Sequence, residues 1–329
     1  MFCIVSLTIF GWLMKKIINS ILPLFLLSFV GIAHSQVIEY PHSVTTIVTH
    51  SSPGGGSDIF LRTLINYLDE YIDTTFIVEN VRGGSSARAI ARVAESTPDG
   101  SVIYASTPTY ILTSLLSNPT ITHEDLDPLV NIFFDQEIIY SREDSPYDSL
   151  TELINASMNN RVNWGASNPA SLERIALEQL KIVSGANASI ITHDGGGELL
   201  LNVLNGTLDL GVGEAQELEA QIRSNQIKIL AIFSDERASL LPLIPTVSEL
   251  GFNIELSKFR GFAVPKNTPP EIAIIFYQAI QNVLNNPEYK AIYEQQLLIP
   301  QLLNTIEFGN FIDSFISTTE STFNDLGMR

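Results

Sequence analysis

The sequence predicts an α/β protein of two domains joined by two crossing strands. Apolar runs of strand length alternate with amphipathic runs of helix length, as they do in βαβ units with parallel sheets. Glycine-, serine- and threonine-rich junctions follow predicted strands in both halves of the chain. A late apolar run, residues 259–265, is predicted to return to the first domain as a strand.

The first 35 residues are predicted to be a signal peptide that is not part of this fold. A basic pair at 15–16 precedes an apolar run at 17–32 and an Ala-His-Ser cleavage signal at 33–35. Met1 and Met14 are both possible start residues. Polar residues interrupt the apolar run and the cleavage signal ends it, which favours removal over a membrane anchor. We therefore expect a periplasmic protein with no stable membrane insertion after processing.

The mature chain is strongly acidic and free of cysteine. The formal net charge is −18, and loss of Lys15 and Lys16 with the signal peptide makes it −20. Such a chain is a poor candidate for binding nucleic acid or an anionic membrane surface. The only cysteine, Cys3, precedes the cleavage position, so we expect no disulfide, thiolate metal site or cysteine nucleophile.

Strands and helices are predicted in order along the chain. The strands of the first region are at 45–49, 76–78 and 102–105, and its helices are at 59–71, at 87–94 and after Tyr110. The strands of the second region are at 138–140, 162–164, 190–193, 208–212 and 229–232, and its helices are at 149–159 and 172–183. Helices at 270–284 and 305–323 complete the first region.

Residues 52–58, Ser-Pro-Gly-Gly-Gly-Ser-Asp, form the junction on which the functional prediction depends. Glycines let a ligand approach the backbone, and the first N–H groups of the following helix carry a partial positive charge. Such a junction attracts carboxylate or phosphate. The alternative is a tight turn in which Ser57 or Asp58 only caps the helix.

Similar junctions recur further along the chain, which favours the anion site over the tight turn. They lie at residues 83–86, 106–110, 165–171 and 194–198. Ligands of open α/β sheets bind at the carboxyl ends of strands. We therefore expect the junctions of both domains to face one cleft.

An ordered set of short motifs resembles the substrate-binding proteins of tripartite tricarboxylate transporters, the TctC/Bug-type periplasmic receptors. The motifs are Pro-Gly-Gly-Gly-Ser-Asp at 53–58 with Arg62, Val-Glu-Asn at 78–80, Pro-Asp-Gly at 98–100, Asp-Gly-Gly-Gly-Glu at 194–198, Asn-Gly at 205–206 before Leu-Asp at 208–209, Pro-Thr at 245–246 with Glu249 and Gly251, and Phe-Arg-Gly at 259–261 with Pro265 and Thr-Pro at 268–269. The resemblance runs from about Tyr40 to the C-terminus.

The resemblance implies a type II periplasmic binding protein that is not an enzyme. Two Rossmann-like lobes, 36–139 with 263–329 and 140–262, are expected to close on a small organic carboxylate. A di- or tricarboxylate is favoured. The receptor then delivers the ligand to membrane permease subunits. We also expect a monomer that needs no cofactor.

The resemblance places the carboxylate between the first junction and the equivalent loop of the second lobe, where backbone N–H groups and ordered water hold it. The predicted ligand-binding residues are Ser52, Gly55, Gly56, Ser57, Asp58, Gly84, Ser85, Thr107, Thr109, Ser167, Asn168, Ser171, Asp194, Glu214 and Arg260. Arg260 either pairs with a second carboxylate of the ligand or forms a structural ion pair. Departures from the usual family pattern at Phe259, Asn168 and Glu173 bear on the identity of the ligand.

Other functions have weaker support in the sequence. A hydrolase would need Ser57, His193 and Asp194 to act together, but Ser57 lacks the G-x-S-x-G frame. The five histidines show no metal-ligand spacing, so no metal site is expected. A periplasmic sensor that presents its ligand-bound form to a receptor kinase uses the same fold and is the alternative function.

Overall fold

A computed structural model describes residues 37–254, 256 and 258–328. The predicted signal peptide, with Cys3 and both possible start residues, lies outside the described residues. Within these ranges, none of the helices combines the length and the apolar character that crossing a bilayer requires.

The first and last parts of the described chain build a six-stranded sheet in the order β11-β4-β10-β3-β1-β2. The strands are β1 (Ile38–Thr49), β2 (Ile72–Asn80), β3 (Val102–Ser106), β4 (Leu126–Asp135), β10 (Lys258–Pro265) and β11 (Leu298–Leu303). β1 is parallel to β2 and β3. β10 is antiparallel to β3 and β4, and β11 is antiparallel to β4.

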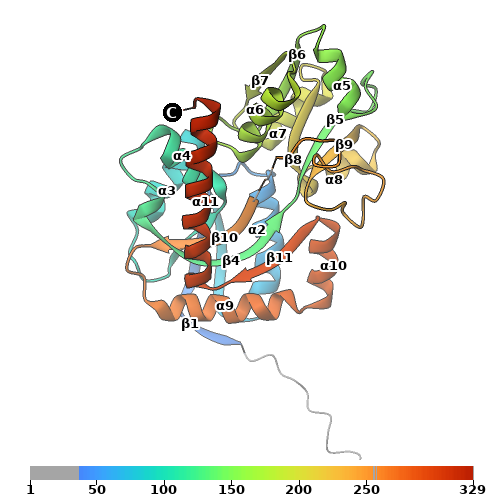
Figure 1. The fold of residues 1–329 in the computed structure, drawn as a ribbon. Coiled ribbons are helices and arrows are strands. Elements are labelled where there is room, and N and C mark those ends of the chain that lie inside the picture. Colours follow the sequence, from blue (N-terminus) through green and yellow to red (C-terminus); the bar gives the residue numbers. More distant parts are fainter. Residues whose placement is uncertain (1–36, 255, 257, 329) are drawn as a thin grey trace, which may run out of the picture. The chain divides into compact units, whose positions relative to one another are not determined.

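Helices cover both faces of this sheet because its strands are apolar on both faces. Neighbouring strand residues such as Ile47 and Val48 point to opposite faces and join different core clusters. Helices α2 (Gly56–Leu68), α9 (Pro270–Leu284) and α10 (Pro287–Gln295) are labelled in Figure 1. Their side chains join the cluster on one face. The cluster on the other face includes side chains of α3 (Ala87–Ala94), α4 (Pro108–Ser117) and α11 (Thr305–Leu326). Short 3₁₀ turns, η1 (Gly84–Ser86) and η2 (His123–Asp125), precede α3 and β4.

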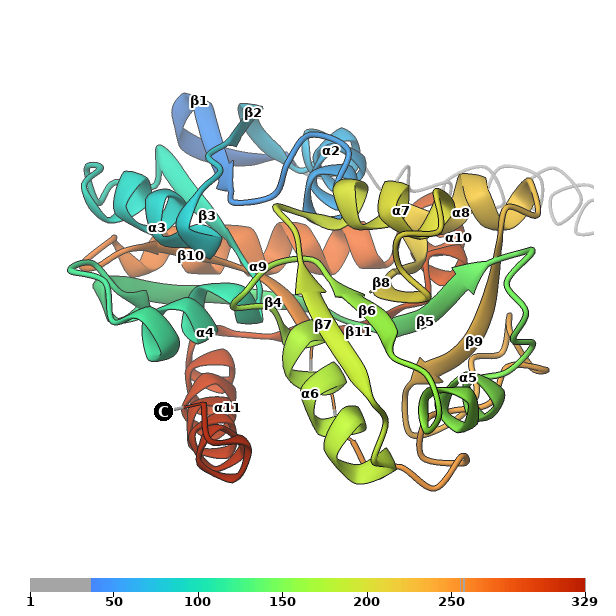
Figure 2. The same cartoon turned by 90° about the horizontal axis from the view of Figure 1, so that it is seen from above.

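The middle of the chain builds a five-stranded sheet in the order β7-β6-β8-β5-β9. The strands are β5 (Glu137–Arg142), β6 (Val162–Ala166), β7 (Ala188–Thr192), β8 (Leu210–Glu214) and β9 (Ile227–Phe233). Helices α5 (Leu150–Ser157) and α6 (Leu172–Ser184) pack on one face, and α7 (Gly196–Leu204) and α8 (Ala215–Arg223) pack on the other (Figure 2).

The chain passes between the two sheets twice. β4 ends at Asp135 and β5 begins at Glu137, so Gln136 separates strands of different sheets. The chain leaves the second sheet after β9 and re-enters the first as β10, which begins at Lys258. Both changes of sheet lie shortly before the predicted lobe boundaries at 139/140 and 262/263. The division into two lobes stays a prediction.

The two-sheet α/β architecture agrees with the prediction, but only part of each sheet is parallel: β1 with β2 and β3, and β6 with β7 and β8. β5 is antiparallel to β8 and β9, and β10 is antiparallel to both of its neighbours. A strand that returns from the other sheet enters from the opposite end, so it runs against its neighbours. The predicted elements did not include β4, β11, α7, α8 and α10.

Candidate functional site

A small polar cavity of about 60 Å³ lies where junctions of the two sheets meet. The residues that line it are His50, Ser51, Ser52, Gly56, Ser57, Thr107, Thr109, Ser167, Asn168, Glu173, Asp194, Gly195, Gly196, Glu214, Glu217 and Lys258. The predicted ligand-binding residues among them are Ser52, Gly56, Ser57, Thr107, Thr109, Ser167, Asn168, Asp194 and Glu214. The predicted residues Gly55, Asp58, Gly84, Ser85, Ser171 and Arg260 are not in the lining.

The first junction is a helix start held by its own aspartate. α2 begins at Gly56, so that residue already belongs to the helix, and Gly55 is the residue before it. The carboxylate of Asp58 accepts hydrogen bonds from the Gly54 N–H at 2.9 Å and from Asn80 Nδ2 at 2.9 Å. It also pairs with Arg62 at 2.9 Å. Burial raises the pKa of Asp58, but these hydrogen bonds outweigh it and leave the pKa below its ordinary value. Asp58 therefore fixes the conformation of the loop from outside the cavity lining.

The second junction has a strained backbone and lies outside the cavity lining. Gly84, Ser85 and Ser86 all have positive φ, at 61°, 50° and 97°. The carbonyl oxygen of Ser85 accepts a hydrogen bond from the hydroxyl of Thr113 on α4. This contact fixes the junction against the neighbouring helix.

The third junction contributes buried hydroxyls to the cavity. Thr107 is 4% exposed and Thr109 is 7% exposed. Thr107 precedes α4 in the capping position, yet its side chain makes no capping hydrogen bond. Within the described ranges, its Oγ1 atom has no hydrogen-bond partner at all.

The junction after β6 divides its polar groups between the cavity and the backbone. Ser167 and Asn168 line the cavity. Ser171 is fully buried and caps α6, because its hydroxyl accepts the N–H of Arg174 at 3.2 Å. Asp194, at the junction after β7, is exposed to solvent, in contrast to Ser171. Its side chain is 85% exposed and lies 3.8 Å from that of Arg82.

The floor of the cavity is a cluster of buried charges centred on Lys258. The Lys258 ammonium forms ion pairs with Glu137, Glu173 and Glu214. Burial lowers the pKa of Lys258, but the three carboxylates raise it well above its ordinary value. The oxygens of the three carboxylates lie within 4.8 Å of one another, a grouping that resembles a metal site. In this protein the ammonium of Lys258 is the cation among them.

Arg260 lies two residues along β10, on the same face as Lys258. Its Nε donates to Asp135 at 2.7 Å and its Nη1 donates to Ser57 Oγ at 3.2 Å. A third donor, Nη2, pairs with Glu214 at 3.1 Å. Arg260 is 1% exposed, and its guanidinium is engaged by groups of the protein itself.

Glu217 is a cavity residue that the sequence prediction missed. Its carboxylate accepts a hydrogen bond from the backbone N–H of Gly56, the first residue of α2. It is half-buried and lies against Gly196 and Gly213. Burial, together with the neighbouring charge of Glu214, raises the pKa of Glu217 well above its ordinary value. A side chain of the protein thus already accepts a hydrogen bond from one of the N–H groups that were expected to bind the ligand.

His50 also lines the cavity without having been predicted. Its Nδ1 atom lies 3.2 Å from the hydroxyl of Tyr104. Burial, and then the charge of Lys258, lowers the pKa of His50 to about 4. His50 is therefore neutral near pH 7.

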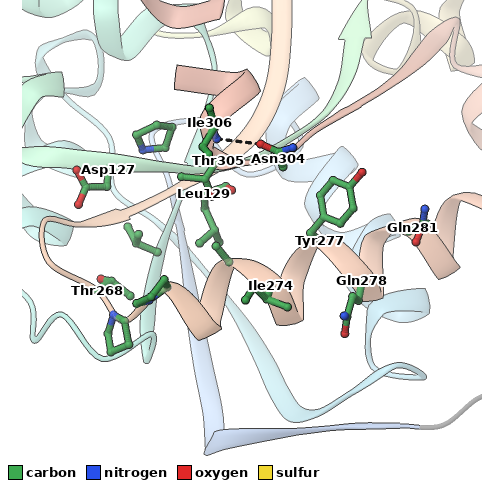
Figure 3. A pocket seen from close by; sticks show the side chains of 15 residues that line it. Asp127, Leu129, Thr268, Ile274, Tyr277, Gln278, Gln281, Asn304, Thr305 and Ile306 are labelled. Atoms are coloured by element: carbon green, nitrogen blue, oxygen red, sulfur yellow. Dashed lines mark hydrogen bonds between the residues drawn. The ribbon is translucent and has the colours of Figure 1, made fainter. Parts of the chain in front are cut away.

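A larger cavity of about 690 Å³ lies elsewhere, between α9 and the start of α11. Its walls are mainly apolar, with Leu129, Ile274, Tyr277 and Ile306 among the lining side chains (Figure 3). None of the predicted ligand-binding residues lines it. The polar cavity between the sheets is therefore the candidate site.

Residues 60–327 match the family profile described as "Tripartite tricarboxylate transporter family receptor". The chain belongs to this family. The resemblance seen in the short motifs is thereby confirmed. Receptors of the TctC family are periplasmic solute-binding proteins and not enzymes, in line with the prediction. The one catalytic set considered is also not assembled: the Ser57 hydroxyl contacts Arg260, and His193 Nδ1 lies 3.9 Å from Glu198.

Relatives within the family are distant in sequence. Protein BugT of Bordetella pertussis is 23% identical over 297 residues, which cover 88% of this chain and 91% of BugT. The structure of the periplasmic binding protein BugD is similar with a TM-score of 0.82 at 21% identity, over 88% of this chain and 99% of BugD. The R. palustris protein Rpa4515, solved with adipate, has a TM-score of 0.82 at 20% identity, over 87% of this chain and 98% of that protein. These similarities establish the type II periplasmic-binding-protein fold.

Proposed function

We propose that this receptor captures a small organic carboxylate between its two sheets and delivers it to the membrane permease subunits of a tripartite transporter. The observation that carries the proposal is the polar cavity, which is lined by helix starts from both sheets. Partial positive charge at such starts favours an anionic group. The adipate in Rpa4515, a protein of the same fold, supports a carboxylate ligand.

The cavity has room for one end of a ligand. Its volume of about 60 Å³ corresponds to roughly four to six water molecules on the measure that assigns about 10–15 Å³ to each. The guanidinium of Arg260 is already engaged by Asp135, Ser57 and Glu214, so it is not free to pair with a second carboxylate. The proposal therefore places one carboxylate of the ligand in this cavity.

A thermal-shift screen of mono-, di- and tricarboxylates tests the proposal, because a ligand that binds only the folded state raises the melting temperature. The control pair is Gly56→Ala and Gly197→Ala. An added Cβ at Gly56 would lie 2.9 Å from the Glu214 carboxyl carbon, whereas none of the described atoms lies within 4 Å of a Cβ at Gly197. We expect Gly56→Ala to lose the shift and Gly197→Ala to keep it. The absence of a shift with every carboxylate would overturn the proposal.

Delivery requires that the two sheets move apart and together around the cavity. The two lobes, 36–139 with 263–329 and 140–262, would rotate about the two crossings of the chain. Small-angle scattering of the monomer with and without a carboxylate from the screen should give a smaller radius of gyration when the ligand is bound. An unchanged radius at saturation would contradict closure. Co-purification of the loaded protein with membrane subunits tests the transport role.

We also propose that the protein reaches the periplasm and loses its first 35 residues there. The Ala-His-Ser signal before Gln36 supports this proposal. Intact-mass analysis of periplasmic protein should give the mass of a chain that begins near Gln36. A mass that includes Lys15 and Lys16 would show the proposal to be wrong.

A further inference from the structure

Acidic side chains outnumber basic ones in the lining of the candidate site. Four acidic side chains line the cavity, namely Glu173, Asp194, Glu214 and Glu217. Lys258, which also lines the cavity, is already paired with Glu173 and Glu214, and with Glu137 outside the lining. Arg260, outside the lining, is likewise paired with Glu214 and Asp135. A ligand with only negative charge would therefore enter beside like charges, which is costly away from water.

Most of the helix starts at the cavity already have a carboxylate of the protein nearby. The N–H of Gly56 at the start of α2 donates to Glu217. Glu173 lies in the first turn of α6, Glu198 in that of α7 and Glu217 in that of α8. These acids take the places where a helix start favours an anion.

Helix α4 is the exception. It has no acidic residue in its first turn, and it begins at Pro108 between two threonines that line the cavity. Thr107 is 96% buried, since 4% of it is exposed, and its hydroxyl has no partner among the described residues. An unpaired buried hydroxyl is unfavourable. An oxygen of a ligand beside these threonines would pair with it and with the hydroxyl or N–H of Thr109.

On the basis of the receptor function proposed above, we propose that the ligand is a small zwitterion. Its carboxylate binds Thr107 and Thr109 at the start of α4, and its ammonium or other cationic nitrogen binds the carboxylates of Glu214 and Glu217. The two sets of side chains thus prefer ligand groups of opposite charge. This arrangement satisfies the unpaired hydroxyl and adds a positive charge to the acidic side of the site.

Matched pairs of ligands that differ in one amino group test this inference. The pairs are alanine with propionate, 4-aminobutanoate with butyrate, and aspartate with succinate, each measured by calorimetry on the mature protein. We expect at least one zwitterion to bind about tenfold or more tightly than its partner, a ratio equivalent to about 1.4 kcal/mol. Failure of all three zwitterions to bind overturns the inference.

The same panel separates this inference from the proposed function. If at least one acid binds and none of the three zwitterions binds more tightly than its matched acid, the zwitterion is excluded while the carboxylate receptor stands. If ethylamine binds and no carboxylate does, both the receptor function and the zwitterion are wrong. Preference for the zwitterion supports both.

Three variants test which side chains bind the carboxylate of the ligand and which bind its cationic nitrogen. Glu217→Gln keeps an oxygen for the Gly56 N–H but cannot ionise beside the ammonium of a bound ligand, which would lower the raised pKa of Glu217. We therefore expect it to weaken the zwitterion about tenfold and to leave the matched acid unchanged or improved. Thr107→Val should weaken both members of a pair by the same factor, because both carry the carboxylate. Glu219→Gln is the matched control, since Glu219 lies on the same helix and pairs with Arg223 at the surface. Equal loss for both members of a pair in Glu217→Gln would contradict the assigned role of Glu217.

Discussion

The ammonium of Lys258 on β10 lies 2.7 Å from the carboxylate of Glu173 on α6. β10 is part of the six-stranded sheet, and α6 packs on the five-stranded sheet. Two further carboxylates, of Glu137 and Glu214, share the same ammonium. The charge cluster therefore joins the two sheets beneath the cavity, and its members depend on one another.

Replacement of the central cation should destabilise the protein strongly. In Lys258→Met, three buried carboxylates lose their shared cation, and of the three only Glu214 keeps a second one among the described residues, Arg260. We therefore expect a loss of about 3–5 kcal/mol in the free energy of unfolding. Urea unfolding of both proteins measures the loss. Lys290→Met is the control, because Lys290 and Glu294 are an exposed pair and should contribute less than about 1 kcal/mol. A Lys258→Met protein as stable as the control would contradict this view of the cluster.

Two glycine-to-alanine changes should have opposite effects on stability. A Cβ at Gly261 on β10 would lie 2.5 Å from the carbonyl oxygen of Val130, and backbone atoms cannot move aside cheaply. We expect Gly261→Ala to cost about 1–3 kcal/mol. Gly309 lies inside α11, where a Cβ would meet Pro128 at an ordinary 3.8 Å. Gly309→Ala should stabilise the protein by up to about 1 kcal/mol, and thermal unfolding distinguishes the two signs.

The stability of the protein should fall as the pH falls through the range set by His50. The pKa of His50 drops from its ordinary 6.5 to about 4 on folding, so between these values the unfolded state binds more protons. The free energy of unfolding therefore decreases as the pH falls from above 6.5 toward 4, and the total decrease is about 3 kcal/mol. The variant His50→Gln lacks this contribution. Its stability should change less than that of the wild type between pH 7 and pH 5, and parallel curves would exclude His50 as a cause.

Two buried threonines near α4 should respond differently to the same substitution. Thr107 has an unpaired hydroxyl, so Thr107→Val removes an unsatisfied group and should stabilise the ligand-free protein by roughly 1 kcal/mol. Thr113 donates its hydroxyl to the carbonyl of Ser85. Thr113→Val should therefore destabilise the protein by roughly 1–3 kcal/mol. A loss of stability in both variants would indicate a partner for Thr107 in the ligand-free state.

Much of the secondary structure could be predicted because it depends on local patterns. Helices at 87–94 and 270–284 coincide with α3 and α9, since helical periodicity and flanking glycine or proline mark both. The order of the strands depends on distant segments. No local signal indicates that β10 inserts between β3 and β4, or that its direction opposes theirs.

The candidate site was predictable where it depends on helix starts and unpredictable where it depends on distant charges. The junctions with Gly56, Thr107 and Ser167 were found because glycine and hydroxyl residues follow strands. Glu217 was missed because α8 is rich in charged residues and resembles a solvated helix. One signal for Lys258 was present: it alternates with Arg260 in an apolar strand, which places two bases on one buried face.

The position of β10 has a consequence for the order in which the sheet can assemble. β3 and β4 belong to the same sheet but do not pair, because β10 lies between them. A chain in which residues 258–265 have not yet reached the sheet contains both strands and lacks the segment that joins them. The six-stranded sheet therefore stays in two pieces with exposed edges until β10 inserts, and such edges attract other chains. A truncation before Lys258 should for this reason aggregate rather than fold.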